Sequence, residues 1–303
     1  MYSSVRKALR KHEFSWRYIF NLSTTVRHRV FDSEALTEPE SRIVRSLKSD
    51  GIAVTSAEEL LPNQDPFEEL VSETQRVLHE KADEIEDLRS QANDESSIGS
   101  KSFNYELLGS EPVFDPKSAM ARIALNSALL RVADHYFRMC VKLRYYNVWE
   151  TFASTGASRE SQLWHVDRED NRILKVFLYL DDVDEGTGPF TYAIGTQMGG
   201  RNRSVRPDSF LESGVSRTTD EQMKAVLPES EWLKCTGKRG TLILADTAGY
   251  HKGGEARTKD RLMFTCMYTS PASESKRLLK YPSAVDVSDL GPRQARALHL
   301  SQR

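Results

Sequence analysis

Apolar and polar positions alternate along this chain with two different periods, one typical of helices and the other of strands. Residues 66–89 carry apolar side chains at three- and four-residue intervals among many charges, which is the pattern of an amphipathic helix. Residues 115–142 repeat this pattern and open on Asp115-Pro116, a favourable helix start. We therefore predict two long helices, each with one buried face, in the first half of the chain.

Shorter elements follow from the same analysis. Residues 39–50 predict a helix that ends at Gly51, and residues 52–55 predict a strand directly after it. Beyond Leu143 the runs become aromatic and β-branched, as in strands. The further predicted strands lie at 143–152, 173–180, 240–246 and 261–269, and further helices at 219–226 and 292–300.

The strand 173–180 is apolar at nearly every position, so we expect it to pack on both faces. With 303 residues the chain can form one large domain. We expect a mainly β fold with flanking helices (α+β). Its parts are a helical N-terminal elaboration at 1–142, a catalytic core at 143–270, a lid-like insertion within the core at 199–238, and a C-terminal tail at 271–303.

Composition narrows the classes of partner. A formal charge of −2 and an isoelectric point near 6.4 argue against extensive contacts with nucleic-acid phosphates, so no nucleic acid is expected. Three scattered cysteines form neither a disulfide framework nor a zinc motif. No apolar stretch approaches the roughly 20 residues of a membrane span. These features favour a soluble, cytoplasmic protein.

The N-terminal segment, residues 1–30, is basic and aromatic. Two interpretations remain open. It can be an amphipathic helix that docks on a membrane surface or a partner, or a helical extension that packs its aromatic side chains onto the domain. The side chains concerned in the second interpretation are Trp16, Tyr18, Ile19 and Phe20.

A candidate metal site lies just before the strand 173–180. His165 and Asp167 are two residues apart, and in an extended chain this spacing places both side chains on one face. His251, which follows the strand 240–246, is the best third ligand if the strands close into a barrel or sandwich. Two histidines and one carboxylate are the facial triad of non-heme Fe(II) oxygenases, which leave positions open for a 2-oxo acid and dioxygen.

A dicarboxylate cosubstrate also needs a fixed cation for its far carboxylate. Arg261 begins the strand after the His251 turn, and a guanidinium can hold a carboxylate through two parallel hydrogen bonds. If Arg261 instead faces solvent, nearby Arg257 is the next candidate. We predict that Arg261 anchors the cosubstrate.

The motifs WHVD, KVFLYLDDV, GTGPFTYAIGTQ and GTLILADTAGYHKGG, followed by Arg261, resemble the phytanoyl-CoA dioxygenase family of Fe(II)/2-oxoglutarate oxygenases. The resemblance covers residues 143 to about 270. It implies a double-stranded β-helix (jelly-roll, cupin-like) core, with His165, Asp167 and His251 as iron ligands and Arg261 as the 2-oxoglutarate anchor. By its position on the strand before the metal pair, Asn147 is implied as a further contact to 2-oxoglutarate.

One position departs from the family pattern. Many members carry a serine two residues after the distal histidine, whereas this chain has Gly253. A hydroxyl partner for the far carboxylate is then missing, or Thr247 or Thr265 supplies it.

The activity that the resemblance implies is oxidation, most simply hydroxylation, of an unactivated C–H bond in a small molecule. Fe(II), 2-oxoglutarate and dioxygen would be used, and succinate and carbon dioxide released. The carboxylate of Asp167 argues against halogenation. Three residues near the expected mouth are candidate substrate contacts or simple packing residues: Trp164, Arg168 and Phe190.

Two alternatives of other classes stay open. The first is a non-catalytic jelly-roll binding module, which would have no need to keep the triad and Arg261 together. The second is a cupin-type metal-dependent hydrolase or isomerase, in which Arg261 has no assigned task. The fold does not choose the substrate.

Overall fold

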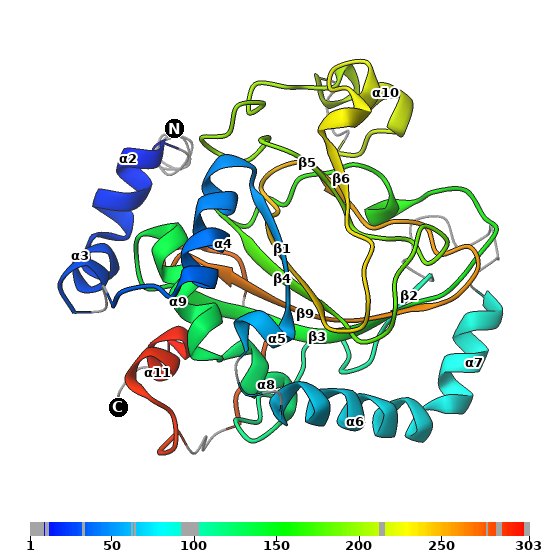
Figure 1. Cartoon of the computed structure of the whole chain (residues 1–303), viewed down its shortest axis with the longest axis horizontal. Helices are drawn as coiled ribbons and strands as arrows, with labels where there is room; N and C mark the ends of the chain where they lie inside the picture. Colours follow the sequence, from blue (N-terminus) through cyan, green and yellow to red (C-terminus); the bar gives the residue numbers. More distant parts are fainter. Residues whose placement is uncertain are drawn as a thin grey trace.

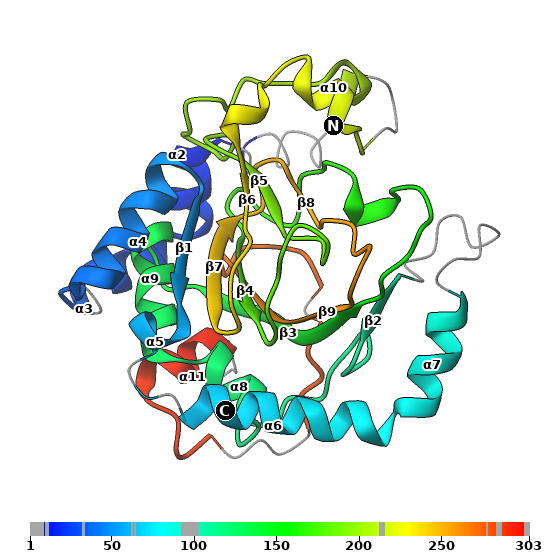
Figure 2. The ribbon, with the colours of Figure 1, turned by 45° about the vertical axis from the view of Figure 1, so that its right-hand side comes forward.

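The computed structural model describes residues 9, 12–31, 34–61, 63, 65–91, 103–211, 216–276, 278–282 and 287–299. Two antiparallel sheets face each other within it (Figures 1 and 2). The larger has the order β1 (Ile52–Ser56), β7 (Thr241–Asp246), β4 (Leu174–Tyr179), β9 (Arg261–Thr269), β3 (Lys142–Thr151) and β2 (Asn104–Glu106). The smaller has the order β6 (Trp232–Lys234), β5 (Thr191–Ala193) and β8 (His251–Lys252). The fold is the predicted double-stranded β-helix with flanking helices.

The two faces of the large sheet have different neighbours. On β4, Leu174, Val176 and Leu178 belong to the core beneath the helices, whereas Phe177 and Tyr179 belong to a second cluster inside the jelly roll. This division follows from the two-residue period of a strand. All six residues of β4 are buried, so the prediction that this strand packs on both faces is confirmed.

Helices cover the outer face of the large sheet, on the side away from the small sheet (Figure 2). Helix α9 (Ser127–Phe137) packs against α4 (Glu38–Ser49) and α11 (Pro292–Leu298). Helix α4 also contacts β7, whereas α11 and α8 (Ala119–Ala124) contact β3. The remaining helices are α2 (Glu13–Ser15), the π-helical turn η1 (Trp16–Phe20), α3 (Leu22–Phe31), α5 (Ala57–Leu60), α6 (Asp65–Glu80), α7 (Ala82–Gln91) and α10 (Asp220–Lys224), with 3-10 turns η3 (Glu160–Gln162), η4 (Asp208–Leu211) and η5 (Glu229–Glu231).

The element at residues 39–55 is confirmed. A Thr37–Glu40 capping box starts α4, and Gly51, with φ +81°, ends the turn before β1. The amide nitrogen of Gly51 donates to the carbonyl of Leu47. Since β1 pairs with β7, the large sheet takes a strand from the segment that we expected to be a helical elaboration.

The prediction of two uninterrupted long helices is wrong, because each is broken once. At residues 115–142 the break is Asn126, whose extended backbone (ψ 132°) ends the helical run and whose Oδ1 accepts from the amide of Ala128. Asparagine side chains compete with the helical backbone in this way. At residues 66–89 the break lies at Lys81, between α6 and α7.

The predicted lid-like insertion at 199–238 lies only partly outside the two sheets. Its end forms β6, which pairs with β5 in the small sheet, and α10 buries Met223 beside Trp164. The bridge between Trp164 and Thr218 ties the segment to the strand end that carries His165.

Trp16 anchors the N-terminal segment, which lies along one edge of the molecule (Figure 1). Its Nε1 donates to Asp170 at 2.7 Å, whereas Tyr18 and Ile19 are exposed, so the expected packing of all four aromatic and aliphatic side chains is only partly realised. Among the residues that the structure describes, none of the helices combines the length and the hydropathy that crossing a lipid bilayer requires.

Candidate active site

The two histidines of the predicted triad face each other across a short antiparallel bridge. The amide of His165 donates to the carbonyl of His251 at 3.0 Å, and the reverse bond has the same length. The ring centroids lie 4.2 Å apart. Asp167 is held beside the two histidines by a backbone hydrogen bond, in which its amide donates to the carbonyl of Thr247 at 2.8 Å. One ligand atom from each of His165, Asp167 and His251 lies within 4.8 Å of the other two.

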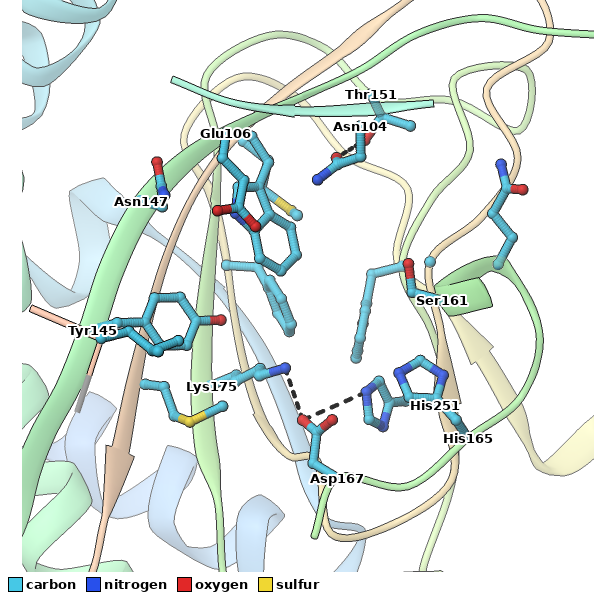
Figure 3. Close-up of a pocket in the computed structure, with 18 of the residues that line it drawn as sticks. Asn104, Glu106, Tyr145, Asn147, Thr151, Ser161, His165, Asp167, Lys175 and His251 are labelled. Carbon is cyan, nitrogen blue, oxygen red and sulfur yellow. Dashed lines mark hydrogen bonds and ion pairs between the residues drawn. The ribbon is translucent and has the colours of Figure 1, made fainter. Parts of the chain in front are cut away.

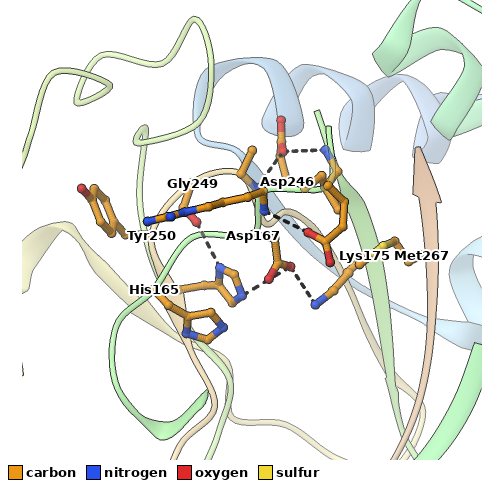
Figure 4. A network of polar contacts seen from close by, with 12 residues as sticks. His165, Asp167, Lys175, Asp246, Gly249, Tyr250 and Met267 are labelled. Atoms are coloured by element: carbon orange, nitrogen blue, oxygen red, sulfur yellow. Dashed lines mark hydrogen bonds and ion pairs between the residues drawn. The ribbon is translucent and has the colours of Figure 1, made fainter. Parts of the chain in front are cut away.

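Backbone carbonyls fix the orientation of both imidazoles. His165 Nδ1 lies 2.9 Å from the carbonyl of Leu163, and His251 Nδ1 lies 3.0 Å from that of Gly249 (Figure 4). A carbonyl can only accept, so each Nδ1 carries the proton and each Nε2 is left with a lone pair. This tautomer is the one in which Nε2 can bind a metal.

The charge states also suit a cation. Burial and the neighbouring His251 lower the pKa of His165 to about 2, and burial lowers the pKa of His251 to about 4. Both rings are therefore neutral near pH 7. Burial would raise the pKa of Asp167, but the charge of Lys175 and its hydrogen bond to the carboxylate outweigh this effect, so that pKa lies below its usual range.

Lys175 is a site residue that the sequence analysis missed. Its Nζ lies 2.7 Å from Asp167 Oδ2, and His251 Nε2 lies 3.8 Å from the same oxygen (Figures 3 and 4). Burial would lower the pKa of Lys175, but Asp167 and Tyr145 raise it above its usual value. A lysine inside an otherwise apolar strand is a signal in the sequence, because lysine is almost never fully buried unless it is paired.

A cavity of about 610 Å³ contains these groups and extends from them along β3 and β9 (Figure 3). Arg261 lines it and is 5% exposed, with Nη2 donating to Thr151 Oγ1 at 3.2 Å. Its Nε and Nη1 have no hydrogen-bond partner among the residues that the structure describes. Burial lowers the pKa of this guanidinium, and no carboxylate of the described chain pairs with it.

Arg257, the second candidate anchor, is already engaged. Its Nη1 donates to the carbonyls of Ser154 and Gly156, and its Nη2 pairs with Glu255. Of the two arginines, Arg261 is thus the one whose donors are free inside the cavity.

The hydroxyl beside Arg261 comes from a different residue than expected. Neither Thr247 nor Thr265 lines the cavity, whereas Thr151 does and contacts Arg261 directly. Thr151 lies opposite Arg261 in the β3–β9 register, which the sequence does not reveal. Gly253 lies close by, since a Cβ there would be 3.8 Å from Arg261 Nη2.

Asn147 also lines the cavity, but backbone groups engage its side chain. Its Nδ2 donates to the carbonyl of Gly109 at 2.8 Å, and its Oδ1 accepts from the amide of Leu108 at 3.1 Å. In this arrangement Asn147 holds the loop after β2 against β3. A contact from Asn147 to 2-oxoglutarate stays a prediction.

Two of the three candidate substrate contacts line the cavity, namely Arg168 and Phe190. Trp164 does not. It is fully buried with Met223 in a separate cluster, and its Nε1 donates to Asp220 at 2.7 Å. The reason is the strand period, because Trp164 is adjacent to His165 and points to the opposite side.

Known proteins with similar folds include non-heme iron enzymes. The structure of EctD from S. alaskensis with bound Fe has a TM-score of 0.49 at 18% identity, covering 82% of this chain and 84% of that one. HygX from Streptomyces hygroscopicus with nickel and 2-oxoglutarate bound has a TM-score of 0.49 at 15% identity, covering 80% and 90%. The α-ketoglutarate dependent epimerase SnoN from nogalamycin biosynthesis has a TM-score of 0.49 at 15% identity, covering 77% and 81%.

No curated protein matches the sequence significantly. The family model described as phytanoyl-CoA dioxygenase (PhyH) matches residues 52–263, which is more than half of the chain and includes all four predicted site residues from His165 to Arg261. The chain therefore belongs to the phytanoyl-CoA dioxygenase family, whose enzymes are Fe(II)- and 2-oxoglutarate-dependent dioxygenases.

Proposed function

We propose that this protein hydroxylates an unactivated C–H bond of a small molecule. In this proposal His165, Asp167 and His251 hold Fe(II), and Arg261 binds the far carboxylate of 2-oxoglutarate. The observation that carries it is the combination of three convergent metal-ligand atoms with a buried arginine whose Nε and Nη1 lack partners, all in one cavity.

The residues fit Fe(II) in donor type and in charge. Two neutral imidazoles and one carboxylate are a donor set typical of non-heme iron, and they occupy one face of an octahedron. When bound there, Fe(II) with 2-oxoglutarate and dioxygen supplies an oxidant for C–H bonds, and succinate and carbon dioxide leave.

The protein contributes orientation and the exclusion of water. The carbonyls of Leu163 and Gly249 hold both Nδ1 protons, so the imidazoles cannot rotate without losing a buried hydrogen bond. Arg261 and Thr151 orient the far carboxylate. The apolar wall is made by Trp149, Phe177, Phe190 and Met263.

We also propose that the part of the predicted insertion 199–238 that precedes β6 acts as a lid on this site. Arg217 of this segment lines the cavity, and Thr218 exchanges backbone hydrogen bonds with Trp164, next to His165. Movement of the lid would then act, through this backbone pairing, on the strand end that carries His165.

Iron and cosubstrate binding can be tested directly. Adding Fe(II) and then 2-oxoglutarate without oxygen should give a weak visible charge-transfer band in the wild type and none in His165→Ala, because two ligands hold an open-site ion poorly. A correctly folded wild type that lacks the band would contradict the proposal. A cupin-type hydrolase or isomerase would bind metal but show no response to 2-oxoglutarate.

Hydroxylation itself requires a second experiment. The enzyme is supplied with 2-oxoglutarate, isotopically labelled dioxygen and pooled cellular metabolites, and succinate formation identifies the active fraction. A product that has gained one labelled oxygen atom supports hydroxylation. A product that has lost two hydrogens would show desaturation instead of hydroxylation. A product of unchanged mass would show epimerisation.

A further inference from the structure

Strand β3 contains a bulge that changes the lining of the cavity. Leu143 pairs with Tyr268 and Tyr145 pairs with Met267, so Arg144 has no partner on β9. An extra residue in one strand re-aims the neighbouring side chains, and such bulges are common next to active sites. Arg144 and Tyr145 both line the cavity, although adjacent residues of a regular strand would face opposite sides. The bulge thus adds a guanidinium to the cavity wall.

This guanidinium is incompletely paired. Arg144 is 9% exposed, and its Nη1 lies 3.4 Å from Glu169 Oε1 and 3.5 Å from Met267 Sδ. Charge-assisted N–H···O bonds are usually about 2.7–2.9 Å long. The Nε is buried and has no hydrogen-bond partner among the described residues. Since burying an incompletely paired charge is costly, a guanidinium of this kind in a cavity wall points to a ligand that completes its pairing.

The net charge of the cavity lining also favours an anionic ligand. Five cationic side chains line it, Arg144, Arg168, Lys175, Arg217 and Arg261, against three acidic ones, Glu106, Asp167 and Glu169. Fe(II) and the 2-oxoglutarate dianion cancel each other, so the loaded cavity keeps a surplus of two positive charges. Such a field attracts an anionic ligand.

We propose that the substrate carries a carboxylate, and that Arg144 binds it. This inference rests on the proposed function, because it concerns the same cavity. A guanidinium offers Nε and one Nη as a planar fork that matches a carboxylate. Tyr145, Met267 and Leu278 line the cavity around Arg144 and give the adjoining part of the substrate an apolar surface.

Saturation-transfer NMR can test this without knowing the substrate. Hexanoate is the probe and hexanamide its uncharged match, with the protein held in Zn(II) and saturating 2-oxoglutarate. We expect hexanoate to bind the wild type and hexanamide to bind much more weakly. Arg144→Gln should weaken hexanoate about tenfold or more, and Arg144→Lys less. Lys238→Gln is the control, because it removes an exposed charge that does not line the cavity and should have a small effect.

Each other outcome overturns the inference. These are equal binding of hexanoate and hexanamide, unchanged hexanoate binding in Arg144→Gln, an equal loss in Lys238→Gln, and hexanoate binding only where it displaces 2-oxoglutarate. The 2-oxoglutarate signal in the same sample reports folding of each variant. Its absence in the wild type would count against the proposed function alone, since saturation transfer to hexanoate needs no metal.

A second, independent observation concerns the N-terminal helices. Nine large hydrophobic residues of the described chain are exposed, and seven of them lie between Leu9 and Val30. Five follow one another at four-residue intervals: Phe14, Tyr18, Leu22, Val26 and Val30. We call these five the apolar stripe. Within α3 this spacing keeps Leu22, Val26 and Val30 on one side of the helix. Phe14 and Tyr18 precede the break at Asn21, and their ring centroids lie 5.1 Å apart.

The opposite side of this segment is fixed to the domain. Trp16 is buried against Asp170, and Arg17 Nη1 donates to the carbonyl of Phe137 at 2.8 Å. Arg27 and Arg29 are exposed beside Val26 and Val30 of the stripe. Over residues 1–31 the sequence has seven arginines and lysines and one acid, Glu13.

We propose that the apolar stripe docks on an anionic lipid surface. Exposed apolar side chains flanked by arginines are the pattern of helices that lie in a membrane interface, where anionic headgroups attract the cations. The net positive charge selects this occupant over a second copy of the chain, whose stripe would bring the same charges together.

Vesicle co-sedimentation tests the surface. The wild type should sediment with vesicles that contain phosphatidylglycerol and much less with phosphatidylcholine alone. Val26→Glu with Val30→Glu should lower the partition coefficient about tenfold. Val113→Glu, at an exposed valine outside the stripe, should not. Binding that ignores phosphatidylglycerol, an equal loss in Val113→Glu, or a wild-type dimer that the double variant loses would overturn the proposal.

Discussion

Two buried cations of the cavity, Lys175 and Arg261, are held in opposite ways. Lys175 Nζ lies 2.7 Å from a carboxylate oxygen of Asp167, so the protein itself compensates its charge. Arg261 has only the neutral hydroxyl of Thr151 at 3.2 Å, and two of its nitrogens have no partner. Both residues are buried and line the same cavity.

The difference indicates which cation is reserved for a ligand. Taking a charge out of water costs several kcal/mol, and a close counter-ion offsets much of this cost. Lys175 has its counter-ion in the folded chain. The desolvation cost of Arg261 is not offset until a carboxylate ligand binds. We therefore propose that Arg261 binds 2-oxoglutarate and that Lys175 positions Asp167.

The largest expected effect comes from breaking the compensated pair. Asp167→Ala removes a proposed metal ligand and leaves the ammonium of Lys175 buried and unpaired. It should abolish metal retention and lower the free energy of unfolding of the metal-free protein by about 3–5 kcal/mol. Denaturant unfolding and a metal-binding titration measure the two effects.

The double variant Asp167→Ala with Lys175→Met separates them. Without a buried charge it should regain most of the stability and still fail to retain metal. If Asp167→Ala alone is as stable as the wild type, Lys175 does not depend on Asp167 for its counter-ion, and the comparison between the two cations fails.

Removing the uncompensated cation should act on the cosubstrate. Arg261→Ala should weaken 2-oxoglutarate about tenfold to a hundredfold, since bonds to charged groups are typically worth about 1.5–3 kcal/mol. Metal affinity without cosubstrate should hardly change. Arg261→Lys keeps the charge but not the fork, and should recover part of the loss.

Titration of 2-oxoglutarate into the metal-loaded variants measures this. Three indistinguishable curves would move the anchor to another cation. Arg144, which lines the cavity and is incompletely paired, would then be the next candidate, because Arg257 is already bound to Glu255 and two carbonyls.

A smaller effect is expected at the hydroxyl beside Arg261. Thr151→Val removes the acceptor that orients Nη2 and should weaken 2-oxoglutarate about fivefold, the value of a typical hydrogen bond of about 1 kcal/mol. Thr265→Val, at a buried threonine outside the cavity, is the control. An equal effect of the two substitutions would show that the loss comes from packing.

The smallest effect should follow Gly253→Ser. The nearest atoms to an added Cβ are the carbonyl oxygen of Ser161 at 3.5 Å and Arg261 Nη2 at 3.8 Å, so a serine fits without displacement. We expect a stability change within about 0.5 kcal/mol and 2-oxoglutarate binding that is equal or up to about fivefold tighter. Weaker binding would mean that the new hydroxyl competes with the carboxylate for Arg261.

The sequence by itself determined five strands of the large sheet, the ends of α4 and the motif that carries His165 and Asp167. These features are local. An apolar strand such as 174–179, the capping box at Thr37 and Glu40, and a two-residue spacing of ligands all depend on residues close together in the chain. His251 and Arg261 were predictable because ordered motifs surround them.

The tertiary structure alone decided what each charged group of the cavity touches. Thr151 lies beside Arg261 because of the β3–β9 register, Lys175 meets Asp167 across the jelly roll, and the bulge turns Arg144 inward. Register and bulges are set by how whole strands pack, and one extra residue reverses which face a side chain occupies. No local pattern of residues carries that information.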